Sequence, residues 1–488
     1  MKTKLFAILM SALFIVTSLS SCRTSSNTPG SSDNLPVSSN ISQEKEESSL
    51  NIQSEISTSS EAQGQTSDPK EPLKENNSSD KNNTSSKKNN YSNNTTSKKE
   101  DNSSTNPPAV QLPSTSSSSV SSEKESTSSA VSSAPSVKVP LKAISPDEYY
   151  GWKQLKAKAT KAEQKAYQLF VETFGKYKST VEFDFDITNE QVENAYNHYR
   201  DDYPQHFWLG TASYRSVGEN IISLTISNNA FGSDAESIRK REKEMLQKAQ
   251  AILSKVDGSM KPIEREHIIH DSLVNSIKYD TTLKEKNAHS LYGALVEGDA
   301  VCEGYSKAFQ YLMREAGVQC IVVKGGFNGD SHEWNMVEID GKFYHIDVTA
   351  DDPISNNKRE NLLKFDYFNL TESEIKRDHI ISGNVYSIPK ADNSKYNFFN
   401  YYGLKAKKLD TASFAKSMVF SVNNGYSYAH ILLENVSMDD AMDYVVPNYK
   451  NIVDAANKTL GYKKIVMGKT ISYSQNTRKN ILSIKLDF

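Results

Sequence analysis

The chain has 488 residues, of which 36% are hydrophobic and 24% are charged, and its formal net charge is −3. That hydrophobic share is low for a globular protein, which indicates that a long part of the chain contributes nothing to a core. The charge is close to neutral, and no stripe of Lys and Arg interleaved with aromatics is present, so the pattern of a nucleic-acid-binding protein is excluded. We expect no nucleic-acid partner.

The first residues have the pattern of an export signal. Lys2 and Lys4 precede an apolar run, Leu5 to Val16, which is too short to span a bilayer. The run leads into Leu19-Ser20-Ser21-Cys22, which resembles the lipobox of bacterial lipoproteins. This resemblance implies a signal peptide over 1–21, acylation of Cys22 and attachment to the extracellular face of the cell membrane. An ordinary cleaved signal peptide is the alternative.

Residues 22–143 form a long polar segment. They are mostly Ser, Asn, Thr, Lys and Glu, and Tyr91 is the only aromatic residue among them. Such a composition cannot bury enough apolar surface to offset the conformational entropy lost on folding. We predict a disordered tether with a root-mean-square span of roughly 60 Å, which would hold a folded head away from the membrane. A passive spacer is the alternative.

The folded part is expected to begin with a helical extension over 144–260. A helix start at Ser145-Pro146 precedes a helical pattern that runs to Phe174, and another helix follows Thr188. The stretch from Phe207 to Ser227 has the composition of a strand pair, and helical patterns return over 234–256 and 262–277. We place a core domain over 261–388.

A small α+β accessory domain is predicted over 389–488. Strand-like runs cover 418–422, 429–433, 463–467 and 481–486, and helical patterns cover 438–444 and 453–460. The domain contains no cysteine. Binding of wall polymer, binding of a protein partner and covering of the core are all compatible with its composition.

Cys302 opens a predicted helix that ends at Gly317. One face of this helix is made of small and apolar residues: Cys302, Tyr305, Ala308, Phe309, Leu312, Met313 and Ala316. Asp299 is the candidate N-cap. A thiol in the first turn faces the positive end of the helix dipole, which favours the thiolate, so this position suits a nucleophile.

Cys302 and Cys320 are the cysteines that remain if Cys22 carries lipid. A disulfide between them is chemically possible in an exported protein. We expect none, because Cys302 opens a helix whereas Cys320 lies in an apolar strand over 318–323, where it would pack as a small hydrophobe.

A β-hairpin follows, with strands over 332–339 and 342–349. Its turn, Asp340-Gly341, is a strong hairpin signal of two residues. A turn of that length pairs Trp334 with Asp347, so His332 and Asp347 become diagonal neighbours on one face of the hairpin. They are then within reach of a hydrogen bond between imidazole and carboxylate.

A thiol at a helix start, together with a histidine oriented by a carboxylate, makes a nucleophile, a base and an orienting group. Cys302, His332 and Asp347 therefore form a candidate catalytic triad. The alternative is that each is ordinary: a core thiol, a histidine at a strand edge and a cap at a strand end. The agreement of spacing, order and face favours the triad.

The same residues resemble the bacterial transglutaminase-like superfamily of papain-related fold. The resemblance spans about 262–378 and is carried by Ala300-Val301-Cys302-Glu303-Gly304-Tyr305-Ser306, by His332-Glu333-Trp334-Asn335 and by Asp347-Val348-Thr349-Ala350-Asp351-Asp352-Pro353. It implies an α+β core in which the catalytic Cys302, at a helix N-terminus, packs on an antiparallel sheet that carries His332 and Asp347. Enzymes of this kind attack an amide and pass the acyl group to an amine or to water.

Several other residues carry weaker signals. His267 and His270 could hold a metal, but they lack the spacing of zinc proteases, and Asp351 and Asp352 do not follow a calcium-loop spacing. His345 is expected to pack in the core or the cleft wall. Tyr292 is a guess for an oxyanion donor, with a packing role favoured. We predict neither a metal site nor a cofactor.

The combined interpretation is an extracellular, lipid-anchored cysteine acyl-transfer enzyme. Its partners would be the membrane, through the N-terminal lipid, and a protein, peptide or cell-wall amide as substrate. A non-catalytic surface binding or scaffold protein is the alternative from another class, and a hydrolase of peptidoglycan stem peptides is a substrate variant of the enzyme.

Overall fold

The computed structural model describes residues 14–16, 39–42, 138–227, 231, 234–352, 363–468 and 470–488. The predicted signal peptide, Cys22 and nearly all of the predicted tether lie outside the described residues. The exceptions are the backbones of strands β1 (Phe14–Val16) and β2 (Ser39–Ser42) and residues 138–143. No helix in the described part of the chain is both long and apolar enough to cross a membrane.

The first described domain is helical, with a small antiparallel sheet, as the sequence predicts. A 3-10 turn η1 (Pro146–Glu148) leads into helices α1 (Tyr150–Lys158), α2 (Lys161–Phe174) and α3 (Asn189–Asp202). Capping boxes begin α2, through Thr160 and Glu163, and α3, through Thr188 and Gln191. Strands β3 (Thr180–Glu182), β4 (Ala212–Val217) and β5 (Asn220–Ile226) pair with β1 in the order β1-β4-β5-β3.

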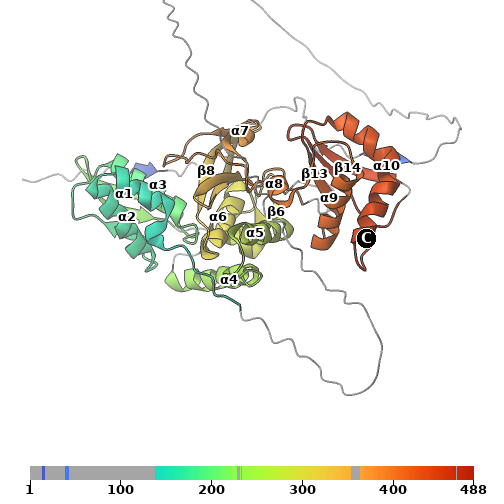
Figure 1. The fold of residues 1–488 in the computed structure, drawn as a ribbon. Helices are drawn as coiled ribbons and strands as arrows, with labels where there is room; N and C mark the ends of the chain where they lie inside the picture. Colours follow the sequence, from blue (N-terminus) through green and yellow to red (C-terminus); the bar gives the residue numbers. More distant parts are fainter. Residues whose placement is uncertain are drawn as a thin grey trace, which may run out of the picture. The chain divides into compact units, whose positions relative to one another are not determined.

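The core domain sets helix α6 against an antiparallel sheet (Figure 1). Its elements before the sheet are α4 (Ala235–Leu253), α5 (Pro262–Ser276), β6 (Lys278–Tyr279), the π-helical turn η2 (Gly293–Glu297), β7 (Asp299–Ala300) and α6 (Cys302–Glu315). The sheet consists of β8 (Cys320–Phe327), β9 (Asp330–Ile339), β10 (Lys342–Ile346) and β11 (His379–Ile381), with α7 (Glu372–Ile375) before β11. Its order is β10-β9-β8-β11, so the α+β core agrees with the sequence.

The last domain has its own hydrophobic cluster. Its elements are α8 (Phe398–Tyr402), β12 (Lys405–Ala406), α9 (Thr411–Asn424), β13 (Tyr428–Leu433), α10 (Met438–Thr459), β14 (Thr470–Asn476) and β15 (Ile481–Lys485). The strands form a sheet in the order β12-β13-β15-β14-β2. The sequence predicts this α+β composition, although four of the predicted elements are wrong.

The first wrong prediction is the strand over 418–422, which is part of helix α9. Asp410 caps α9, and Phe414, Met418 and Val422 recur every four residues on its buried face, so helical packing overrides the β-propensity of the run. The predicted helices over 438–444 and 453–460 are one helix, α10, which continues through Pro447 because both halves bury the same face. Residues 463–467 are not a strand, apart from an isolated bridge at Val466.

A buried ion pair joins the helical extension to the core. Arg314 of α6 lies 3.3 Å from the carboxylate of Asp202 at the end of α3, and the two side chains are 3% and 1% exposed. The same carboxylate accepts the backbone N–H groups of Gly151 and Trp152 and the hydroxyl of Tyr167. Asp202 therefore caps α1 from a distance and fixes the extension against the helix that begins at Cys302.

Replacing Asp202 by Ala should destabilise the protein strongly. The substitution leaves the Arg314 guanidinium buried without its partner, which costs about 3 to 5 kcal/mol of unfolding free energy, to be measured by urea denaturation. The matched control is Asp184→Ala, which removes an exposed pair with Lys165 and should leave the transition nearly unchanged. Equal effects of the two substitutions would contradict the role given to Asp202.

Candidate active site

Cys302 is the first residue of α6, and its side chain is buried. The predicted N-cap, Asp299, is wrong: Asp299 and Ala300 form β7, a parallel partner of β6, so the backbone stays extended through Val301, which is the N-cap. The predicted stop at Gly317 is confirmed, since its φ of 79° is in the left-handed region that glycine adopts freely.

The start of α6 is held by a close backbone approach at Gly304. A Cβ at this position would lie 2.3 Å from the carbonyl oxygen of Ala288, so only glycine fits there. The predicted inner face of α6, from Cys302 to Ala316, is buried. These contacts fix the direction in which the first turn of the helix presents Cys302.

The β9–β10 hairpin has the predicted register. Lys342 pairs with Ile339 and Ile346 with Asn335, across a turn in which Asp340 and Gly341 both have positive φ. Strand β10 is shorter than predicted, because it ends at Ile346 and Asp347 begins a turn. The turn folds back on the aspartate, whose Oδ1 accepts the backbone N–H of Ala350 at 3.1 Å.

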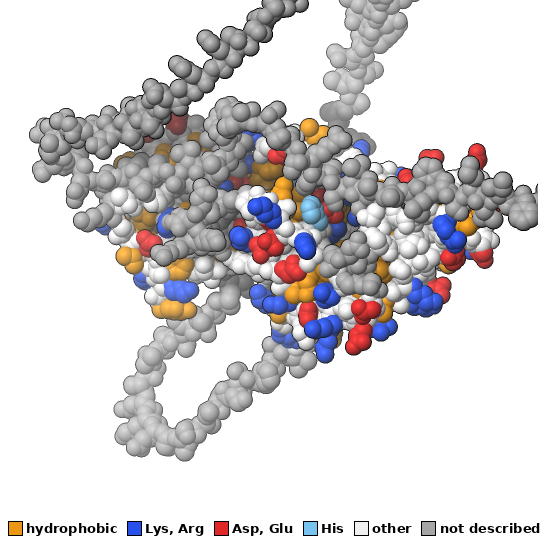
Figure 2. Space-filling model, turned by 180° about the vertical axis from the view of Figure 1, so that it is seen from behind, with side chains coloured by type: hydrophobic (Ala, Val, Ile, Leu, Met, Phe, Trp, Pro, Cys, Tyr) orange, Lys and Arg blue, Asp and Glu red, His pale blue; other side chains and the backbone are white. Residues whose placement is uncertain are grey.

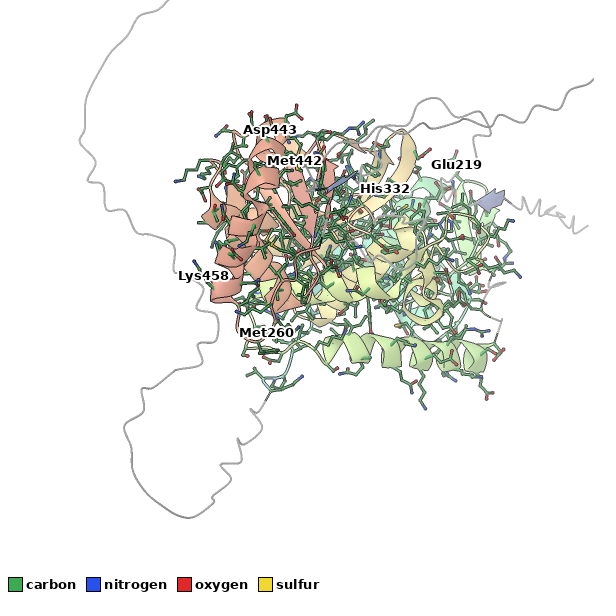
Figure 3. The ribbon with its side chains drawn as sticks, turned by 90° about the vertical axis from the view of Figure 1, so that its right-hand side faces the viewer. Glu219, Met260, His332, Met442, Asp443 and Lys458 are labelled. Atoms are coloured by element: carbon green, nitrogen blue, oxygen red, sulfur yellow. The ribbon has the colours of Figure 1, made fainter. Side chains whose placement is uncertain are left out.

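His332 and Asp347 make the predicted hydrogen bond. His332 Nε2 lies 2.7 Å from Asp347 Oδ2, and the two side chains are 8% and 0% exposed. Burial lowers the pKa of His332, but the charge and hydrogen bond of Asp347, together with a hydrogen bond to Cys302, raise it to about 10. The imidazole is thus hydrogen-bonded to Asp347, and its pKa also depends on Cys302. Figure 3 labels His332 in the core, and Met442 and Lys458 on α10.

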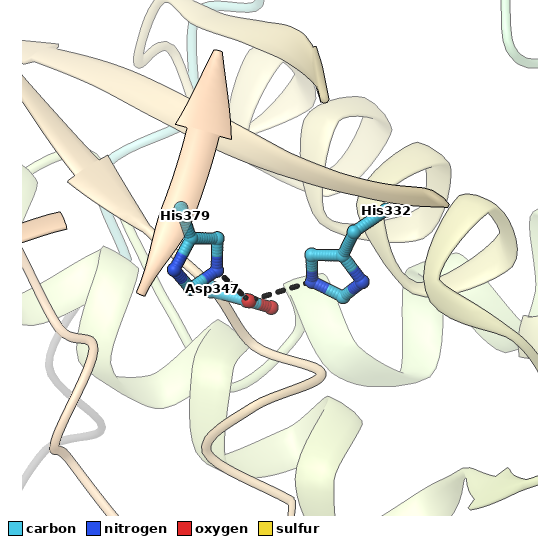
Figure 4. A group of neighbouring side chains, drawn as sticks. All are labelled: His332, Asp347 and His379. Atoms are coloured by element: carbon cyan, nitrogen blue, oxygen red, sulfur yellow. Dashed lines mark hydrogen bonds and ion pairs between the residues drawn. The ribbon is translucent and has the colours of Figure 1, made fainter. Parts of the chain in front are cut away.

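A second histidine, which the sequence analysis missed, shares the carboxylate. His379 Nε2 lies 3.0 Å from the same Oδ2 of Asp347, so two imidazoles converge on one oxygen (Figure 4). His379 is stacked on Phe327, with ring centroids 4.4 Å apart. Despite burial, which lowers it, the pKa of His379 is raised by its hydrogen bonds to Asp347 and Asp378. Burial raises the pKa of Asp347, but the charges and hydrogen bonds of His332 and His379 lower it more, so the pKa lies below the ordinary range.

Strand β11 brings His379 to this place. It pairs with β8, opposing His379 to Phe327 and Ile381 to Gly325. A Cβ on Gly325 would lie 1.7 Å from the carbonyl oxygen of Ile380, so glycine is needed for the two strands to pair. No short-range spacing links His379 to Asp347, and only the unusual glycine pair in β8 could have hinted at the approach.

Comparison with known proteins identifies the domain that holds these groups. Residues 235–348 match the family model of the transglutaminase-like superfamily. The chain carries a transglutaminase-like domain. The matched segment runs from the start of α4 to just beyond β10 and includes Cys302, His332 and Asp347, whereas His379 lies outside it.

Two curated relatives match a limited part of the chain. The kyphoscoliosis peptidases of Mus musculus and Homo sapiens are both 29% identical to it over 102 residues, which is 18% of this chain. The chain spans 15% of the length of these relatives. A solved structure described as a crystal structure of a TGase is 18% identical to this chain, and the match covers 49% of this chain and 67% of that one with a TM-score of 0.23.

The remaining predictions around the transglutaminase-like domain concern cysteines and oxyanion donors. Cys302 and Cys320 are both free, so the expected absence of a disulfide between them is confirmed, and Cys320 is buried in β8. Tyr292 packs against Phe207, with ring centroids 5.2 Å apart, and donates its hydroxyl to Glu244 at 2.7 Å. Its role is therefore packing.

The weaker histidine signals belong to buried networks. The ring nitrogens of His267 interact with the hydroxyls of Tyr402 and Tyr426, and those of His270 with Asp271 and Asp351. His345 accepts a hydrogen bond from the Trp334 indole at 3.1 Å. Burial lowers its pKa to about 3, so it is neutral at physiological pH.

One cluster among the described residues has the donor set of a metal site: His332, Asp347 and His379, whose ligand atoms lie within 4.8 Å of one another. Two imidazoles and a carboxylate suit a transition metal. However, both Nε2 atoms are already hydrogen-bonded to Asp347 Oδ2 at 2.7 and 3.0 Å. A metal there would replace those bonds and remove His332 from Asp347.

The raised pKa of His332 predicts a pH-dependent contribution to stability. A histidine that titrates at about 6.5 when unfolded and at about 10 when folded stabilises the protein fully below the lower value and loses that contribution as the pH rises to the higher one. The unfolding free energy of the unaltered protein, minus that of His332→Gln, should therefore fall by at least about 1 kcal/mol between pH 6 and pH 10. Denaturant titrations at each pH measure this difference.

The matched control is the buried His345, whose pKa is lowered to about 3 by burial. Because its folded pKa lies below the unfolded value, the same difference for His345→Gln should not fall over that range. A flat profile for His332→Gln as well would mean that the imidazolium of His332 is not held by Asp347.

Proposed function

We propose that this protein is an extracellular, lipid-anchored cysteine acyl-transfer enzyme in which Cys302, His332 and Asp347 form the catalytic triad. The observation that carries the proposal is the buried hydrogen bond between His332 and Asp347. The imidazole is 2.7 Å from the Asp347 carboxylate, and Cys302 contributes to the raised pKa of His332. A nucleophile, a base and an orienting group are the parts that acyl transfer requires.

The reaction starts from a thiolate and an imidazolium. The Cys302 sulfur attacks the carbonyl carbon of an amide, and the carbonyl electrons move to its oxygen, for which the Cys302 backbone N–H in the first turn of α6 is a candidate donor. His332 gives its proton to the departing amine as the C–N bond breaks, leaving a thioester. Asp347 keeps the imidazole oriented and stabilises its charged form.

The second half of the reaction uses the neutral imidazole. His332 removes a proton from an acceptor amine or from water, the acceptor attacks the thioester, and Cys302 leaves as the thiolate. An amine acceptor makes the enzyme a transferase and water makes it a hydrolase. The fold is compatible with both reactions and does not by itself identify the substrate. The proposed substrate class is a protein, peptide or cell-wall amide.

The location is inferred from the sequence. The apolar run Leu5 to Val16 and the lipobox-like Leu19 to Cys22 support export and acylation of Cys22. Two or more acyl chains would anchor the protein stably. A polar segment of the composition seen over 22–143 would let the catalytic head reach substrates at a distance from the membrane.

The binding or scaffold alternative is less favoured. A surface that only binds needs no buried carboxylate to orient a histidine beside a thiol, and such a carboxylate is costly to desolvate. Asp347 is 0% exposed, and its partners are the histidines and the backbone of Ala350.

Alkylation of Cys302 tests the ion pair without a substrate. In the full chain, the rate of modification by iodoacetamide, mapped to Cys302 by mass spectrometry, should stay high at pH 6, where an isolated thiol with a pKa of about 8.5 reacts slowly. His332→Ala should slow the reaction at pH 6 by roughly tenfold or more, because the imidazolium no longer stabilises the thiolate. Identical slow rates in both proteins would refute the triad.

Substitution of the nucleophile tests the activity itself. Cys302→Ala should abolish amine release from amide substrates, a loss of roughly 10³-fold or more, while the thermal unfolding temperature stays close to that of the unaltered protein. Cys320→Ala is the matched control, because Cys320 is buried in β8 and has no part in the reaction. Adding a primary amine to the assay then distinguishes transfer from hydrolysis by the product formed.

A further inference from the structure

A buried series of charged side chains continues beyond the candidate triad. His379, which shares the Asp347 carboxylate, places its other ring nitrogen, Nδ1, 2.8 Å from Asp378 Oδ1. Asp378 Oδ2 in turn accepts the hydroxyl of Tyr367 at 2.9 Å and lies 3.3 Å from the ammonium of Lys479. The order of groups from the nucleophile outward is thus Cys302, His332, Asp347, His379, Asp378 and Lys479.

Lys479 belongs to the last domain, in the turn between β14 and β15. Its backbone N–H is held by Asn476 Oδ1 at 3.1 Å, and its ammonium also donates to the carbonyl oxygen of Glu374 at 3.0 Å. The same ammonium lies 4.5 Å from the centre of the Tyr367 ring. The lysine therefore has a defined position against the core domain.

The charged side chains beyond Asp347 are buried. The side chains of His379 and Asp378 are 0% exposed, and that of Lys479 is 4% exposed. A buried lysine is rare unless it is paired, and breaking a buried pair leaves an uncompensated charge. Despite burial, which raises it, the pKa of Asp378 is lowered by the hydrogen bond from His379 and the charge of Lys479.

We propose that Lys479 is a positioning residue for the active site: it holds the Asp378 carboxylate, which holds His379 as the second donor to Asp347. The inference rests on the proposed function and gives the last domain a role in it. His379 and Lys479 both lie outside the segment that matches the family model, 235–348. The last domain then supplies the outermost part of the catalytic site.

The physical basis is the strength of a charge-assisted hydrogen bond. With Asp378 ionised, His379 carries protons on both ring nitrogens and donates to Asp347 as a cation. A hydrogen bond from a charged donor is roughly twice as strong as one from a neutral donor. The charged groups that face His379 are Asp347, Asp378 and His332. The neutral His345 is hydrogen-bonded to the indole of Trp334. Without Lys479, Asp378 loses its buried cation, and the donor to Asp347 is weakened.

The test is the pH profile of Cys302 alkylation by iodoacetamide in the full chain. Lys479→Met keeps most of the volume of the side chain and removes its charge, and it should slow alkylation at pH 6 by about tenfold. Lys479→Arg retains a cation and should restore most of the rate. Arg478→Met is the matched control, because the neighbouring Arg478 contacts Asn328 of the core but does not belong to the series of charged side chains that leads to Asp347. The Arg478→Met protein should react like the unaltered protein.

A double substitution distinguishes positioning from general stability. If Lys479 acts through His379, then His379→Gln alone and His379→Gln with Lys479→Met should show the same rate, because the second change has nothing left to act through. Additive losses would mean that Lys479 acts by another route. A rate for Lys479→Met within about twofold of the unaltered protein, or above it, would also overturn the proposal.

These failures differ from a failure of the proposed function. If the triad itself is wrong, the unaltered protein reacts slowly at pH 6 and His332→Ala changes nothing. If only the role of Lys479 is wrong, the unaltered protein reacts rapidly, His332→Ala is slow and Lys479→Met matches the unaltered protein. Thermal unfolding of each variant tests whether its domains remain folded.

Discussion

The buried carboxylate of Asp347 is the group on which the arrangement of the site depends. It is fully buried and accepts hydrogen bonds from His332, His379 and the backbone of Ala350. A carboxylate removed from water is costly unless such partners compensate it. The hairpin that supplies His332, the strand that supplies His379 and the turn after β10 must therefore all be in place before this charge is stable.

Helix α6 and the elements around it provide the other half of the site. The close backbone approach at Gly304 and the buried face of the helix fix its first turn. At its other end, Arg314 pairs with Asp202 of the helical extension, which in turn caps α1. The extension thus stabilises the helix that presents Cys302, at a position far from the chemistry itself.

Over the described part of one face, acidic and basic side chains are interspersed (Figure 2), in keeping with the small net charge.

The last domain contacts the core through apolar as well as polar side chains, because Phe398, Phe399 and Ile481 belong to the same hydrophobic cluster as residues of the core. The last domain has a hydrophobic cluster of its own, yet its β14–β15 turn places Lys479 in a buried charge chain that ends at Asp347. Buried charged networks of this kind are sensitive to the loss of any member, because each charge is compensated by its neighbours. If Lys479 has the role proposed, catalysis and the docking of the last domain depend on each other.

Much of this protein was determined by local sequence. The period of the apolar residues in α6, the Asp340-Gly341 turn and the resulting register sufficed to bring His332 and Asp347 to hydrogen-bonding distance, because a tight turn fixes which residues face each other. The thiol at a helix start was equally local. Where β-branched residues lay in a helix, as in α9, local propensity misled, since the cap at Asp410 and the packing of one face outweighed it. The contributions of His379 and Lys479 were decided only by the tertiary structure. They reach Asp347 through the pairing of β11 with β8 and through the turn after β14, contacts between distant parts of the chain that leave no periodic signal in the sequence.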